Sequence, residues 1–175
     1  AVWASTQNKH GAPGFCTQSG DALFKIYRAT GDTLYADLLR DVIHAHAEGI
    51  QPNGKITERL TYCDADSRGG RGDGGKTGWN ETNGALMALE IPGIYVRTDL
   101  PEVYVFDHVN AEIVKQEGQL IRLKISNPTN YDATVTILAE NQEMAQKPLG
   151  DNAFLHWTEK VKVKAGKSML YTIRK

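Results

Sequence analysis

The stretch RLKISNPTNYDATVTILAE, residues 122–140, sets the character of the C-terminal half of the chain. Two β-branched segments flank NPTNYD, whose proline and asparagines are typical of a tight connection. With these two, which span residues 119–127 and 133–140, this half has six short segments with a period of two; the other four are residues 102–109, 111–116, 159–165 and 168–175. KQEGQL, residues 115–120, has the glycine of a hairpin turn. The pattern predicts an antiparallel β-sandwich over residues 102–175.

The N-terminal half has the 3.6-residue period of helices instead. SGDALFKIYRATGD has a cap at Ser19, places Ala22, Leu23 and Ile26 on one face, and breaks at Gly31. The next helix, predicted to end before Gly49, repeats apolar residues at Leu34, Leu38, Leu39, Val42 and Ile43. The short ATGD link predicts an antiparallel helical hairpin.

A third helix is predicted from about residue 81 to residue 90, where Pro92 stops it. Three helices and a long glycine-rich loop bury too little apolar surface to stand alone comfortably. We therefore expect the sequence to begin in the middle of a domain. The expected fold class is α+β and multidomain, with helical hairpins over residues 1–100 and a β-sandwich over residues 101–175.

The helical half resembles a known architecture. HGAPGFCTQSGDALFKIYRATGDTLYADLLRDVIHAHAEG, above all its ALFKIYRATGDTLYADLLRD part, is similar to a hairpin of the six-hairpin, or (α/α) toroid, carbohydrate-active enzymes. GWNETNGALMALEIPGIYV resembles the opening of a later inner helix, and RLKISNPTNYDATVTILAE is similar to the sandwich that often follows such toroids. The resemblance implies the C-terminal part of a larger enzyme, whose inner helices point their N-terminal ends toward a sugar-binding cavity.

Composition is that of an ordinary soluble domain, with 41% hydrophobic and 23% charged residues. The net charge of −1 gives no general attraction to nucleic acid or an anionic membrane. No apolar run approaches the roughly 18 residues that span a bilayer. The two cysteines, Cys16 and Cys63, leave open both a bridge and two free thiols. Phosphate-loop, dinucleotide and serine-hydrolase motifs are absent from the sequence.

The first candidate site groups Trp79, Asn80, Glu81 and Asn83 before the third predicted helix. An indole offers a flat apolar face to a sugar ring, and the amide and carboxylate groups supply directional hydrogen bonds. Glu81 is the candidate acid or base, although glycosidases need a second carboxylate. The alternative is purely structural, with Asn80 and Glu81 capping the helix while Trp79 packs against it.

A glycine-rich loop, residues 63–78, carries mixed charges, including Arg68, Arg71 and Asp73. Guanidinium groups beside a sugar cavity would suit uronic acids, because they pair with carboxylates through two parallel hydrogen bonds. Mutual neutralisation in a solvated loop is the plain alternative. The spacing lacks the terminal acidic ligand of a calcium-binding helix–loop–helix, since that position is Gly75. No cofactor is expected, and only a calcium site assembled with other segments stays open.

His10 and Gln18 lie in the segment that leads into the first helix and could reach the same cavity. We expect the whole protein to be a glycoside hydrolase that is secreted or periplasmic, acts through carboxylates, and has carbohydrate and the missing part of the toroid as partners. One alternative is a polysaccharide lyase that acts on uronic acids, with His10 or Tyr62 as the base. The other is a non-catalytic carbohydrate-binding or scaffold module. The sequence predicts neither a nucleic-acid partner nor a membrane span.

Overall fold

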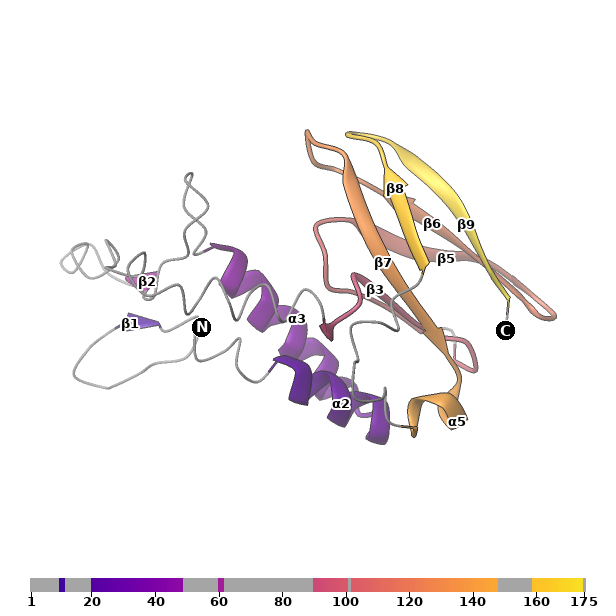
Figure 1. The fold of residues 1–175 in the computed structure, drawn as a ribbon, viewed down its shortest axis with the longest axis horizontal. Coiled ribbons are helices and arrows are strands. Elements are labelled where there is room, and N and C mark those ends of the chain that lie inside the picture. Colours follow the sequence, from indigo (N-terminus) through magenta and orange to yellow (C-terminus); the bar gives the residue numbers. More distant parts are fainter. Residues whose placement is uncertain are drawn as a thin grey trace. The chain divides into compact units, whose positions relative to one another are not determined.

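The computed structural model describes residues 10–11, 20–48, 60–61, 90–100, 102–147 and 159–174. The chain divides into two compact units (Figure 1). The first comprises Ala1–Tyr27 and Gly31–Leu89, and the second comprises Arg28–Thr30 and Glu90–Lys175. Within the described ranges, no helix combines the length and apolarity needed to cross a membrane.

The first unit contains two helices and a short strand pair. Strands β1 (His10–Gly11) and β2 (Leu60–Thr61) pair antiparallel. Helices α2 (Gly20–Thr30) and α3 (Thr33–Glu48) confirm the two helices predicted from the sequence. Gly31 separates the two helices because its φ of 72° lies outside the right-handed helical region. Glycine adopts this conformation without strain. The Asp32 carboxylate then accepts from the Leu34 N–H at 3.0 Å and caps α3.

The buried face of α2 centres on two aromatic residues. Phe24 and Tyr27 are buried, whereas Ala22 is exposed and Ile26 is 40% exposed. Phe24 and Tyr27 lie on one side of the helix, and Ala22 and Ile26 lie on another; both sides fit a 3.6-residue period. Burial of the side with the two aromatic rings removes more apolar surface from water. Of the three apolar residues that the sequence places on one face, Leu23 is half-buried, while Ala22 and Ile26 are exposed.

In α3 the prediction was right for part of the face. Leu39 and Val42 are buried as predicted, together with Ala36. Leu34 and Leu38, which belong to the same apolar repeat, are 64% and 47% exposed. The inner stripe of α3 is thus narrower than its apolar sequence pattern.

The second unit contains two β-sheets. Its elements are β3 (Ile94–Arg97), β4 (Glu102–Val105), β5 (Asn110–Glu117), β6 (Leu120–Ser126), β7 (Ala133–Glu140), α5 (Gln142–Ala145), β8 (Glu159–Val163) and β9 (Ser168–Arg174). One sheet has the order β4-β3-β7-β8 and the other β5-β6-β9. The six strand segments predicted from the sequence are all present, and the mostly antiparallel two-sheet β-rich part is confirmed.

Strand β3 differs from the prediction in two ways. It was not predicted at all, and it pairs parallel with β7, with Ile94 opposite Ile137. All four of its residues are buried, so it lacks the polar alternation that marks a half-exposed strand. It is also only four residues long and closely follows Pro92 and Gly93. Of the predicted third helix, residues 81–90, only Glu90 is described, and it is helical.

The hydrophobic core lies between the two sheets. It forms because buried and exposed side chains alternate along the strands. In β6 the residues alternate exposed and buried, with Ile121, Leu123 and Ile125 inside. They join a single hydrophobic cluster with residues of the other sheet, such as Val135 and Val163. Burial of one face from each sheet is what makes the pair of sheets stable.

The NPTNYD connection is held by Asn127, which is 2% exposed. Its side-chain amide donates to the carbonyls of Tyr131 at 2.7 Å and Val163 at 3.1 Å. Its side-chain oxygen accepts from the backbone N–H and the hydroxyl of Thr129. The predicted tight connection is confirmed. The buried side chain of Asn127 supplies hydrogen-bond partners to the backbone of this connection.

Asp132, the last residue of the same connection, is surrounded by hydrogen-bond donors and positive charge. Its carboxylate accepts from Lys164 Nζ at 2.8 Å and from the Ala165 N–H at 3.1 Å, and it pairs with Lys162 Nζ at 3.3 Å. The hydrogen bond from Lys164, above all, lowers the pKa of Asp132 from 3.8 to about 2.

We predict that Asp132→Asn is less stable than the wild type at neutral pH, and that the difference disappears in acid. Because the folded carboxyl has the lower pKa, its stabilisation is complete above about pH 4 and is lost as the pH falls toward 2. Urea unfolding midpoints of both proteins between pH 2 and 7 measure this. Lys164→Gln should show the same convergence, because it removes the principal partner. A difference that stays constant over this range would contradict the prediction.

Candidate functional site

The residues that the sequence analysis assigned to a sugar cavity lie, apart from one, outside the described residues. These are Gln18, Tyr62, Arg68, Arg71, Trp79, Asn80, Glu81 and Asn83. His10 is the exception for its backbone alone, which pairs with Thr61 in the short β1–β2 ladder. Among the described side chains, no group of three or more histidine, cysteine, aspartate or glutamate residues could hold a metal ion. The polar arrangements below therefore come from the second unit.

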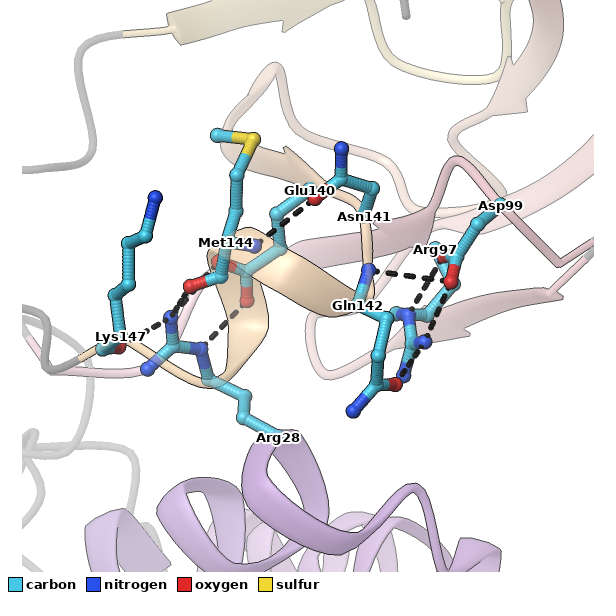
Figure 2. Close-up of polar contacts among 8 residues, drawn as sticks. All are labelled: Arg28, Arg97, Asp99, Glu140, Asn141, Gln142, Met144 and Lys147. Atoms are coloured by element: carbon cyan, nitrogen blue, oxygen red, sulfur yellow. Dashed lines mark hydrogen bonds and ion pairs between the residues drawn. The ribbon is translucent and has the colours of Figure 1, made fainter.

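The most buried polar arrangement joins Arg28 to Glu140. Arg28 belongs to the last turn of α2, which clusters with the second unit, and Glu140 ends β7. Figure 2 shows the guanidinium facing the carboxylate. Arg28 Nε donates to Glu140 Oε1 at 2.5 Å, and Nη2 donates to Oε2 at 2.8 Å. The two side chains are only 5% and 3% exposed. A two-pronged pair of this kind is the strongest ion-pair geometry that proteins use.

The same arginine also closes the end of α5. Its Nη2 group donates to the carbonyl oxygens of Met144 and Lys147, each at 3.3 Å. The last carbonyls of a helix lack partners within the helix, and a cation there stabilises them. At the other end, the Asn141 side chain accepts from the Met144 N–H at 2.9 Å. The one-turn helix α5 is thus capped at both ends.

A second polar cluster lies at the start of α5 (Figure 2). Arg97, which is 2% exposed, donates to both carboxylate oxygens of Asp99, at 3.0 and 2.9 Å, and to Gln142 Oε1 at 2.5 Å. Asp99 also accepts from the Gln142 N–H at 3.1 Å. The hydrogen bonds from Arg97 lower the pKa of the Asp99 carboxyl.

Chemically, these two clusters fasten the fold. Each carboxylate of Glu140 and Asp99 is engaged through both of its oxygens by a guanidinium. Both oxygens of such a carboxylate are already occupied by protein donors, so neither oxygen is free to exchange a proton with a substrate. We therefore assign Arg28, Glu140, Arg97 and Asp99 to holding α5 and the last turn of α2 against β3 and β7.

A groove at the margin of the sandwich has different properties. It encloses about 460 Å³ and is lined by residues of β7, β8 and β9, which are Ile137, Leu138, Ala139, Glu159, Tyr171, Thr172, Ile173 and Arg174. Within it the Tyr171 hydroxyl donates to Glu159 Oε2 at 2.9 Å. Burial, together with the neighbouring Glu159 carboxylate, raises the pKa of Tyr171 to about 12, so the phenol stays protonated near neutral pH.

The sequence analysis identified none of the residues of the buried pairs or the groove. Arg28 and Glu140 are 112 positions apart, and each one in isolation looks like an ordinary charged residue at the end of a helix or strand. The groove could be identified only from the order of the strands in the two sheets, because it depends on β8 and β9 being edge strands. For Glu140, the local signal was a charged residue directly after the apolar run Ile137–Ala139.

Comparisons of the chain with protein-family models, with curated proteins and with solved structures find no match.

Proposed function

We propose that this chain is the C-terminal portion of a carbohydrate-active enzyme, a glycoside hydrolase that acts on a polysaccharide or oligosaccharide and works in a secreted or periplasmic setting. The observation that carries the proposal is the combination of consecutive helices with a two-sheet β-sandwich in one chain. The buried Arg28–Glu140 pair supports it further, because it ties the last turn of α2 to strand β7. In this role the sandwich braces the hairpins of an (α/α) toroid.

The proposed cavity lies at the leading ends of the inner helices. Trp79 would stack on a sugar ring, while Asn80, Asn83 and Gln18 would bind hydroxyls. Glu81 would act as the acid or base, with its carboxylate partner elsewhere in the protein, and His10 would assist proton transfer. These roles follow from residue chemistry and from the resemblance to toroid enzymes.

A polysaccharide lyase that acts on uronic acids is the second candidate. Arg68 and Arg71 could neutralise the substrate carboxylate, and His10 or Tyr62 could remove the neighbouring proton. A non-catalytic carbohydrate-binding or scaffold module is the third, and the groove beside Tyr171 favours it, because a groove of this size can hold a ligand without catalysing a reaction.

The test is product analysis on the protein expressed from its complete open reading frame. Incubation with a panel of neutral and acidic polysaccharides should release new reducing ends without the ultraviolet absorbance of an unsaturated sugar. Glu81→Gln should slow this release by about 10²- to 10⁴-fold. Glu112→Gln, the same change on an exposed strand position, is the matched control and should leave the rate unaltered.

Three outcomes separate the candidates. An ultraviolet-absorbing product would favour the lyase over the hydrolase. Binding to a polysaccharide with no product would favour the scaffold module. A Glu81→Gln variant as active as the Glu112→Gln control would remove Glu81 from the mechanism.

A further inference from the structure

The two sheets end side by side at one margin of the sandwich. In the described part of the chain, β8 is the last strand of the four-stranded sheet and β9 the last of the three-stranded sheet. Figure 1 shows these two yellow strands next to each other. The hydrogen bond from Tyr171 to Glu159 joins β9 to β8 across this margin. The pairing of β7 with β8 stops at Ile137, whereas β7 itself continues to Glu140.

The groove at this margin combines apolar walls with polar groups. Ile137 and Ile173 belong to the walls, and the Tyr171 ring adds an aromatic surface. Thr172 supplies a hydroxyl, and Arg174 supplies a guanidinium. A volume of about 460 Å³ falls within the range of about 300–1,000 Å³ that small-molecule sites occupy. A mixed lining with a few convergent polar groups is what such sites have in common.

Two of the three strands that line the groove, β8 and β9, carry an excess of positive charge. Residues 159–174 carry five positive side chains and one negative side chain, a net charge of +4, in a chain whose net charge is −1. The positive residues are Lys160, Lys162, Lys164, Lys167 and Arg174. Lys162 and Lys164 share Asp132, whereas the other three have no acidic partner among the described residues. This excess of positive side chains on β8 and β9 favours an anion over a cation as a ligand at this margin.

We propose that this groove binds an acidic oligosaccharide, a sugar chain whose rings carry carboxylates. Arg174 pairs with a ring carboxylate, the Tyr171 ring contacts the apolar face of a sugar, and Thr172 and Glu159 bind hydroxyls. The lysines of β8 add attraction that depends on ionic strength. The choice of a saccharide among anions rests on the proposed function, but the site is separate from the proposed cavity around Trp79.

Titration calorimetry on the full-length protein tests this with two matched probes, trigalacturonate and uncharged galactotriose. We expect binding of trigalacturonate that weakens as salt is raised, and binding of galactotriose at least tenfold weaker. Arg174→Gln should weaken trigalacturonate binding by about 10- to 100-fold, because a hydrogen bond to a charged group is lost. Tyr171→Phe should weaken it less, by about fivefold, because the aromatic ring remains.

Lys124→Gln is the matched control, since it removes the same charge from an exposed strand residue that does not line the groove. It should leave the affinity within about twofold, as expected for one screened surface charge. Equal affinity for the two sugars, an equal loss in Lys124→Gln and Arg174→Gln, or displacement of trigalacturonate by duplex DNA at the same charge concentration would overturn the proposal. Turnover is measured separately. If the protein is active but does not bind trigalacturonate selectively, only the proposed role of the groove is refuted. If it binds trigalacturonate selectively but shows no turnover, only the proposed function as a glycoside hydrolase is refuted.

Discussion

Glu140→Ala should lower the free energy of unfolding of the β-sandwich by about 3–5 kcal/mol. The carboxylate is 3% exposed and is the only anion that the described structure places against the Arg28 guanidinium. Removing it leaves a buried cation without its counter-charge. The loss would be a large part of the roughly 5–15 kcal/mol that stabilises a domain. Guanidinium-induced unfolding, with hydrogen exchange at the amides of β3 and β7, measures it.

Two further variants test whether the loss of stability comes from the burial of the ion pair. Glu112→Ala removes an exposed partner of Lys124, and we expect a cost of about 0–1 kcal/mol. The double variant Arg28→Met with Glu140→Leu removes both charges and keeps apolar volume, so it should recover most of the stability lost in Glu140→Ala. If Glu140→Ala cost no more than Glu112→Ala, the buried pair would not be a fastening point of the fold.

The β-rich half could be predicted because its strands bury one face and expose the other. In β6, charged Arg122 and Lys124 alternate with buried Ile121, Leu123 and Ile125, and this alternation is visible in the sequence. Strand β3 could not be found in this way. It is buried on both faces, so no alternation distinguishes it from a short piece of an apolar helix.

The helical half shows why a correct helix does not guarantee a correct face. The period of α2 was right, but Ile26 lies at the surface while Phe24 and Tyr27 lie inside. A helix that is apolar over a wide arc can turn either side inward, and only its neighbours decide which side is buried. Arg28 adds to the ambiguity, because a charged residue at 4% exposure can be identified only from its partner 112 positions away.

The second large effect is expected at Leu123, at the centre of the three-stranded sheet. Its side chain is fully buried, and its neighbours in register are Ile113 on β5 and Tyr171 on β9. It belongs to the cluster that contains core residues of both sheets. Leu123→Ala should lower the free energy of unfolding by about 2–5 kcal/mol, because the lost apolar burial and the cavity left behind both cost stability.

Leu170→Ala provides the matched control, because it makes the same chemical change on the same sheet. Leu170 is 59% exposed and pairs in register with Lys124, on the face of β9 opposite to the core. Its truncation should change the free energy of unfolding by no more than about 0.5 kcal/mol. The comparison separates core packing from strand propensity, since both variants replace leucine by alanine within a strand. Similar losses in the two variants would mean that strand propensity, and not the core between the sheets, determines how this half of the chain tolerates substitution.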